Sequence, residues 1–448
     1  MKKVLLLTLS VFFLLTTGFS QAIKVEVRET EDGYSLYRDG KPYYIKGAGG
    51  KTQIDQLIYL GGNSIRTWGV DEADEALELA AKHDLTVMLG LWVQHERHGF
   101  DYNDEAAVQK QLENFTQVVM KYKDHPNLLL WGIGNEVDLF YSNTKVWDAI
   151  QDIAAMVHRL DPNHPTSTVT AGIDSMEVQE VMRRAPDIDI YGINTYGDIG
   201  KVPDQIKRYG WEGPYIISEW GPNGHWEVPS TTWGAPVEQT STEKAASYRM
   251  RYQDYIAANK GKCIGSYVFL WGQKQETTST WYGLFTQEGD PTEPLDELYK
   301  AWREVDSVPN YSPSISSLTL DSRTANDNIR LKSGDSYLAN VSYSDRDGDR
   351  LSIKWLIYPE SSDTKAGGDF ESAIQPILGT FRSRKKESAE IVAPETEGGY
   401  RLFVFIQDSG KRTAYANIPF YVEPRTKDDP PAKAIRFKKQ ELQLTPNP

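Results

Sequence analysis

The chain has 448 residues, a formal net charge of −14, 39% hydrophobic residues and one cysteine, Cys263. Its negative charge disfavours nucleic acids and anionic membranes as partners, and a lone cysteine excludes an intramolecular disulfide. A globular chain of this length exceeds one ordinary domain unless that domain is a barrel.

Residues 1–22 have the features of a secretion signal. Lys2 and Lys3 give a basic start, the apolar run Val4–Phe19 follows, and Ser20 and Ala22 supply the small residues that signal peptidases prefer. The run is shorter than the roughly 20 apolar residues of a membrane span, so we expect no such span. The expected location is periplasmic or extracellular, with cleavage near Ala22. No cysteine lies at the cleavage site, so we expect no lipid anchor.

Residues 23–305 predict a (β/α)8 barrel preceded by a hairpin. The hairpin has strands at Val25–Val27 and Tyr34–Arg38, with an Asp39-Gly40 turn that leads into the first barrel strand. We expect this hairpin to cover the bottom of the barrel.

Eight apolar runs alternate with amphipathic stretches. The runs are nearly continuous, which is typical of parallel strands buried on both faces. The expected strands are Tyr43–Gly47, Ser64–Trp68, Thr86–Val93, Leu128–Asn135, Ser167–Ala171, Ile188–Asn194, Tyr215–Ser218 and Gly265–Trp271. The expected helices are Gln53–Leu60, Ala73–Lys82, Ala106–Lys121, Val146–Leu160, Ser175–Arg184, Pro203–Tyr209, Thr242–Asn259 and Leu295–Val305. Eight such units in about 280 residues match the usual size of a TIM barrel, an α/β fold.

The sequence pattern changes after Asp306. Ser307–Ser317 is rich in Ser, Pro and Asn and predicts a linker or the start of a domain. Residues 306–425 predict a small antiparallel all-β sandwich, immunoglobulin-like in class, with Trp355 in its core. Its expected strands are Asp335–Ser344, Leu351–Tyr358, Ser388–Val392, Tyr400–Asp408 and Ala414–Val422. Residues 426–448 are a charged tail that we expect to be disordered or to add one edge strand.

The segment Asp345–Asp349, Asp-Arg-Asp-Gly-Asp, resembles the start of a calcium-binding loop. Such a loop needs an acidic residue at its twelfth position, where this chain has Leu356. We therefore predict a tight hairpin turn here.

Two glutamates stand at the ends of predicted strands, where active sites of such barrels lie. Asn135-Glu136 follows the fourth strand directly, and Ser218-Glu219 ends the seventh. Two carboxylates about 5–5.5 Å apart cleave a glycosidic bond with retention: one attacks the anomeric carbon and the other protonates the leaving oxygen. A negative neighbour raises the pKa of the proton donor, so that the two groups take different roles.

With these motifs, the region from about Tyr43 to Trp302 resembles the clan A glycoside hydrolases. The segment 125–127, His-Pro-Asn, followed by the strand that leads to Glu136, particularly resembles the barrel domain of the family 2 enzymes. The resemblance implies a retaining O-glycosyl hydrolase with Glu136 as acid/base and Glu219 as nucleophile.

Four further residues match the pattern of the clan. Arg66 matches the strand-two arginine that holds the nucleophile, and Asn135 matches the residue that bonds the sugar 2-hydroxyl. Tyr196 matches the strand-six tyrosine beside the nucleophile, and Trp271 matches the strand-eight tryptophan that floors the subsite. Asn194 is a departure, because many members carry His two residues before that tyrosine, and this leaves the orientation of the nucleophile open.

Two loops are expected to line the cleft. Trp92, His95 and His98 follow strand three, where we expect contacts with sugar. A catalytic zinc needs three protein ligands and the two histidines lack a third, so we predict no metal and no cofactor. The long loop after strand seven carries Trp226 and Trp233 and predicts a subsite wall, with packing of Trp233 against the barrel rim as the alternative.

A barrel followed by an immunoglobulin-like domain at this size also resembles the family 158 endo-β-1,3-glucanases, which implies laminarin-type β-1,3-glucan as the first substrate. Alternatives within the class are another β-glucan, a β-mannan, an exo-acting β-glycosidase or a transglycosylase. Alternatives of another kind are a non-catalytic glycan-binding protein, or a C-terminal domain that grips the polysaccharide. Linkage, chain-end preference and oligomeric state stay open at this point.

Overall fold

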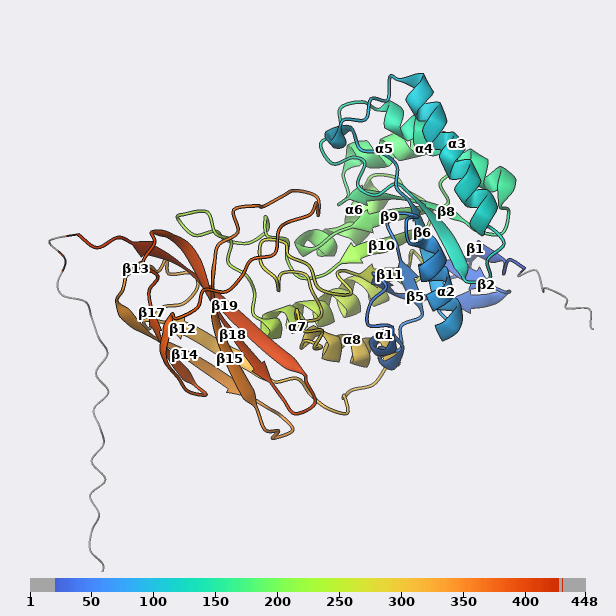
Figure 1. The fold of residues 1–448 in the computed structure, drawn as a ribbon. Coiled ribbons are helices and arrows are strands. Elements are labelled where there is room, and N and C mark those ends of the chain that lie inside the picture. Colours follow the sequence, from blue (N-terminus) through green and yellow to red (C-terminus); the bar gives the residue numbers. More distant parts are fainter. Residues whose placement is uncertain (1–20, 427–428, 430–448) are drawn as a thin grey trace, which may run out of the picture.

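A computed structural model describes residues 21–426 and 429. It shows a barrel with a β-sandwich beside it (Figure 1). The predicted signal segment and the predicted tail lie almost entirely outside the described residues. Within the described part of the chain, no helix has both the length and the apolar character needed to cross a membrane.

Eight parallel strands close into a barrel, which confirms the predicted TIM barrel. The strands are β4 (Ile45–Gly49), β5 (Ser64–Arg66), β6 (Thr86–Leu91), β7 (Leu128–Ile133), β8 (Thr166–Ala171), β9 (Ile190–Asn194), β10 (Tyr215–Trp220) and β11 (Cys263–Val268). They pair in sequence order, and β11 closes the ring between β10 and β4. The strands are almost entirely buried, and this explains their continuous apolar runs.

The helices surround this barrel. They are α1 (Ile54–Leu60), α2 (Ala73–His83), α3 (Glu105–Tyr122), α4 (Lys145–Leu160), α5 (Ser175–Arg184), α6 (Val202–Arg208), α7 (Ser241–Met250) and α8 (Pro294–Arg303). One prediction needs correction: the single helix expected over Thr242–Asn259 changes after Met250 into a π-helical turn, Arg251–Ile256, and then a short 3₁₀ turn.

A three-stranded sheet covers the bottom of the barrel, as predicted for the hairpin. Its strands are β1 (Val25–Thr30), β2 (Gly33–Arg38) and β3 (Lys41–Tyr43). The Arg38 guanidinium donates to the carbonyl of Pro126 at 3.0 Å, and the Tyr43 hydroxyl donates to that of Asn63 at 2.8 Å. Both acceptors precede barrel strands, so these contacts lie at the N-terminal ends. Tyr44 belongs to neither β3 nor β4, so the first barrel strand starts at Ile45 and not at Tyr43 as predicted.

The second domain is a sandwich of two four-stranded sheets. One sheet has the order β12 (Ser314–Leu320), β14 (Ser336–Ser344), β17 (Ser388–Val392) and β16 (Phe381–Arg384). The other has the order β13 (Arg330–Lys332), β19 (Thr413–Glu423), β18 (Gly398–Gln407) and β15 (Ser352–Pro359). Trp355 is buried in the core between them, as expected.

Two details of this domain differ from what the sequence predicted. Strand β13 pairs in parallel with β19, so the sheets are not wholly antiparallel. Strands β14 and β15 belong to different sheets, so Asp345–Asp349 crosses between the sheets and the predicted hairpin turn is wrong. The alternating pattern shows that both flanking strands have one buried face, but not which sheet each one joins. The immunoglobulin-like assignment stays a prediction.

The sandwich lies beside α7 of the barrel domain (Figure 1), and a buried polar network joins the two there. The Lys244 ammonium of α7 contacts Glu238 Oε1 at 2.6 Å and the carbonyl of Thr280 at 2.8 Å. From β19, the Tyr415 hydroxyl lies 3.1 Å from this ammonium, and the Asn417 amide donates to Glu238 Oε2 at 2.7 Å. Since buried charges are tolerated when they are paired and hydrogen-bonded, this network fixes the sandwich in place.

Candidate active site

The two glutamates singled out in the sequence meet at the C-terminal mouth of the barrel. Glu136 follows β7 and Glu219 lies near the end of β10, and both line one cavity of about 240 Å³. Asn135, Tyr196, Trp92 and Trp226 from the predicted set line the same cavity. The barrel topology produces this arrangement because all eight strands present their carboxyl ends to one opening.

Glu219 is buried and is held by three hydrogen-bond donors. Its Oε1 accepts from Arg66 Nη1 at 3.0 Å and from Trp68 Nε1 at 2.7 Å, and its Oε2 accepts from the Tyr196 hydroxyl at 3.0 Å. Arg66 comes from the end of β5 and is itself buried, so its charge is little screened. These contacts stabilise the ionised carboxylate and aim it into the cavity.

Glu136 has a different environment. Its Oε1 accepts one hydrogen bond from a neutral group, the Asn194 amide, at 2.8 Å. Burial and, after it, the negative charge of Glu219 raise the pKa of Glu136 to about 8. At neutral pH this carboxyl is therefore mainly protonated and able to donate a proton.

Asn194 and Asn135 connect the two glutamates. The Asn194 amide nitrogen also donates to Asn135 Oδ1 at 3.1 Å, and Arg66 Nη2 donates to the same oxygen at 2.6 Å. The Asn194 oxygen accepts from the Ser218 hydroxyl at 2.9 Å. Where many relatives are expected to carry a histidine, this chain thus uses an amide that reaches the acid side of the site and does not titrate.

The loop after β6 forms a stack of rings at one side of the cavity. The Trp92 ring lies 4.7 Å from His95, which in turn lies 5.1 Å from His98. Burial and the adjacent charge of Arg97 lower the pKa of His95 to about 4, and Arg97 Nε donates to His95 Nδ1 at 3.0 Å. His95 is therefore neutral and supports Trp92 from behind; it does not line the cavity.

Two predicted aromatic contacts lie elsewhere. Trp233 packs 5.9 Å from the Tyr421 ring of the sandwich, on the domain interface, and not against the cleft. Trp271 is 1% exposed, donates to the carbonyl of Thr52 and belongs to the barrel core. Strand β11 ends at Val268, so Phe269 and Leu270 face the cavity in its place. Trp226, by contrast, is 61% exposed beside the Tyr196 ring at 5.9 Å.

Several lining residues were not predicted from the sequence. Trp68 could have been predicted as a lining residue, because it follows Arg66 closely at the end of the same predicted strand. Lys274 and Glu276 come from the loop after β11 and form an ion pair of 2.9 Å. Gly367 and Gly368 come from the sandwich, and nothing in the sequence linked that loop to the barrel mouth.

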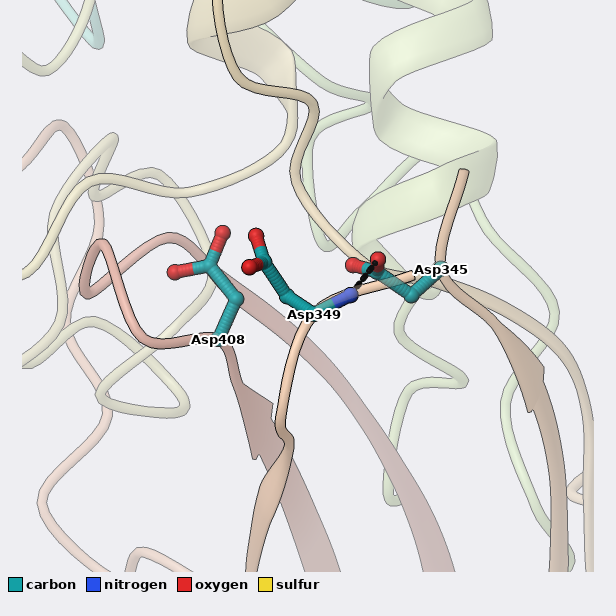
Figure 2. A group of neighbouring side chains, drawn as sticks. All are labelled: Asp345, Asp349 and Asp408. Carbon is teal, nitrogen blue, oxygen red and sulfur yellow. Dashed lines mark hydrogen bonds between the residues drawn. The ribbon is translucent and has the colours of Figure 1, made fainter. Parts of the chain in front are cut away.

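Among the described residues, one group has the spacing of metal ligands, and it lies on the sandwich (Figure 2). It consists of Asp345, Asp349 and Asp408. The backbone N–H of Asp349 donates to Asp345 Oδ1 at 2.8 Å, and Asn310 donates to Asp408 Oδ2 at 2.7 Å. Carboxylate oxygens of Asp345 and Asp408 therefore already accept hydrogen bonds from the protein. His95 and His98 do not belong to this group.

The fold and the paired carboxylates define the class of glycoside hydrolases. Residues 56–306, more than half of the chain, match the family described as glycosyl hydrolases family 2, TIM barrel domain. The chain therefore belongs to glycoside hydrolase family 2, within the clan expected from its motifs.

The individual relatives share only a low sequence identity with this chain. A β-glucuronidase of Paenibacillus borealis is 22% identical over 328 residues, which cover 64% of this chain and 54% of the relative. A β-glucuronidase of Canis lupus familiaris is 23% identical over 35% of this chain and 26% of its own length. The solved β-glucuronidase of Ruminococcus gnavus superposes with a TM-score of 0.50 and 14% identity, over 64% of this chain and 53% of that one. The chain thus spans about half the length of its first curated relative.

Proposed function

We propose that this protein is a retaining β-glycosidase in which Glu219 is the nucleophile and Glu136 is the acid/base. The observation that carries the proposal is the difference between two carboxyl groups on one cavity. Glu219 receives three hydrogen bonds, one of them from a buried arginine, while Glu136 receives one from a neutral amide and has a raised pKa.

The proposed reaction has two steps. Glu219 attacks the anomeric carbon while the carboxylic acid of Glu136 gives its proton to the glycosidic oxygen, the C–O bond breaks and the leaving sugar departs. Formation of the glycosyl ester removes the charge of Glu219, so the pKa of Glu136 falls. The Glu136 carboxylate then takes a proton from water, which attacks the anomeric carbon and releases Glu219.

For the substrate, we propose a neutral β-linked glucan, with laminarin-type β-1,3-glucan cleaved in endo fashion as the first candidate. The charges of the cavity support a neutral sugar, because Lys274 is paired with Glu276 and both catalytic groups are acidic. The linkage itself rests on the resemblance of the two-domain architecture. We also retain the proposal that the protein is secreted.

β-Glucuronidase activity is the second candidate, favoured by the names of the relatives. It would require Lys274 to exchange Glu276 for the carboxylate of a glucuronic acid. Hydrolysis of aryl β-glucuronide at a rate above that of aryl β-glucoside would favour this candidate.

The test is product analysis by NMR with oligomers of laminarin, lichenan, cellulose, mannan and xylan. We expect β-configured first products from one β-glucan. Azide is expected to rescue Glu219→Ala with an inverted product and Glu136→Ala with a retained one. An inverted product from the wild type, or binding of a glycan without any hydrolysis, would overturn the proposal.

A further inference from the structure

One loop of the sandwich reaches the catalytic cavity. It connects β15 with β16, and we call its residues 365–369 the strap. Gly367 and Gly368 of the strap line the cavity that holds both glutamates. A domain separate from the barrel in sequence therefore forms part of the wall around the reacting groups.

The strap is tied to two different barrel loops. Asp369 Oδ2 accepts from Arg97 Nη1, after β6, at 2.9 Å, and the carbonyl of Gly368 accepts from Lys274 Nζ, after β11, at 2.6 Å. Just beyond the strap, buried Glu371 accepts from the backbone N–H of Thr277 at 2.7 Å. Because its anchors lie on both sides of β4 and β5, the strap bridges part of the barrel mouth.

Gly367 also packs closely against the loop that carries Glu136. A Cβ atom on Gly367 would lie 2.5 Å from Leu139 Cδ2, and the residue has a φ of +63°, which favours glycine. The strap therefore lies directly against the segment that follows the proposed acid/base.

A second cavity, of about 470 Å³, adjoins the first and shares Glu136, Tyr196, Trp226 and Gly367 with it. Glu136 lines it and Glu219 does not, while Lys365, Ala366 and Gly367 of the strap form part of its wall. Because the acid/base protonates the departing oxygen, a cavity that is lined by Glu136 and not by Glu219 lies on the leaving-group side. Two exposed rings also line it, Phe140 at 70% and Trp226 at 61% exposure.

We propose that the strap, Phe140 and Trp226 together form the binding site for the leaving group, and that this site takes a β-linked sugar ring. Flat rings cover the apolar C–H faces of a pyranose, and the strap supplies the part of the wall that comes from the sandwich. The proposal rests on the proposed function, since the role of Glu136 defines the leaving-group side. The sandwich thereby takes part in substrate selection.

The experiment compares two substrates of the same sugar. A β-glycosyl fluoride has a leaving group too small to fill the second cavity, whereas a β-linked oligosaccharide fills it. Phe140→Ala and the strap variant Ala366→Trp are expected to lower kcat/KM for the oligosaccharide about 10-fold more than for the fluoride. Phe370→Ala is the matched control, since this ring is 81% exposed, follows the strap and lines neither cavity.

The two proposals fail in different ways. If the wild type hydrolyses fluorides and oligosaccharides, but Phe140→Ala and Ala366→Trp alter both equally or neither, the glycosidase stands and the leaving-group site is wrong. If the wild type cleaves neither the β-glycan oligomers nor the β-fluorides of glucose, mannose, xylose, galactose, glucuronic acid and their β-linked disaccharides, the proposed function itself is overturned and the leaving-group site with it.

Discussion

Glu136 and Glu219 carry the same functional group, and their neighbours give them different chemistry. Around Glu219 the donors are a guanidinium, an indole and a phenol, all of which favour a negative charge. Around Glu136 the main influences are burial and the charge of Glu219, both of which favour a bound proton. The second influence disappears when Glu219 is changed, and this makes the coupling measurable.

We therefore expect kcat/KM to fall as the pH rises through about 8, because Glu136 then loses the proton that it must donate. Carboxyl-carbon NMR of Glu219→Gln should show Glu136 titrating at lower pH than in the wild type, since the amide removes a neighbouring charge. An unchanged pKa of Glu136 in that variant would contradict the coupling.

The same shift predicts a cost in stability. Folding raises the pKa of Glu136 above its ordinary value of 4.5, so the unfolded chain gives up this proton at lower pH than the folded protein does. The contribution of this group to the free energy of unfolding therefore falls as the pH rises from about 4.5 to 8. Glu136→Gln should raise Tm at pH 8 more than at pH 4.5 in calorimetry. An equal rise at both values would show that the gain does not come from the buried charge.

The loop after β6 presents Trp92 to the cavity, and the ring of His95 stacks against Trp92 and supports it. His95→Ala removes that support and is expected to lower kcat/KM about 10-fold, mainly through KM, because one flat contact with the sugar becomes mobile. His95→Phe keeps a ring behind Trp92 and should retain most of the activity.

The pH distinguishes this supporting role from an acid–base role. His95 is neutral above about pH 4, so the shape of the pH profile should be the same in the wild type and in His95→Phe. Loss of one limb of the profile in His95→Phe would indicate that the imidazole itself takes part in proton transfer.

Elements with a strong local pattern were predictable. Apolar or β-branched runs located all eight barrel strands, including β8, which consists mainly of Thr and Ser. Polar residues directly after two of the predicted strands located both glutamates. The end of β11 was not predictable, because Phe269, Leu270 and Trp271 continue the apolar run after the strand has ended. The short strands β13 and β16 were missed, since they carry few of the apolar residues that mark a strand. Strand β12 was missed because its serines resemble a linker.

The position of the sandwich relative to the barrel was not predictable from the sequence. The contact between Arg97 and Asp369 joins residues 272 positions apart, and neither residue has a local signal for the other. The strap and the network around Lys244 exist only because the sandwich packs against one side of the barrel (Figure 1).

The buried pair of Lys244 and Glu238 should therefore control how the two domains unfold. Lys244→Met leaves Glu238 buried without its cation. We expect this variant to lower the free energy of unfolding, measured by urea denaturation, by about 3–5 kcal/mol. Adding Glu238→Gln should recover part of that loss, because the amide accepts hydrogen bonds from Asn417 without carrying a charge. Equal stability of the single and double variants would show that the charge is not what matters.

In the proposed mechanism Glu219 forms a covalent bond to the sugar, and this bond can be detected by trapping the glycosyl-enzyme. The reagent is the 2-deoxy-2-fluoro-β-glycosyl fluoride of the sugar that the wild type hydrolyses. It should glycosylate Glu219 faster than water hydrolyses the glycosyl-enzyme, so that the intermediate accumulates. Mass spectrometry should then find one added glycosyl group, on the peptide that contains Glu219. An adduct on any other carboxylate, or turnover with inversion and no adduct, would contradict the assignment of Glu219 as the nucleophile.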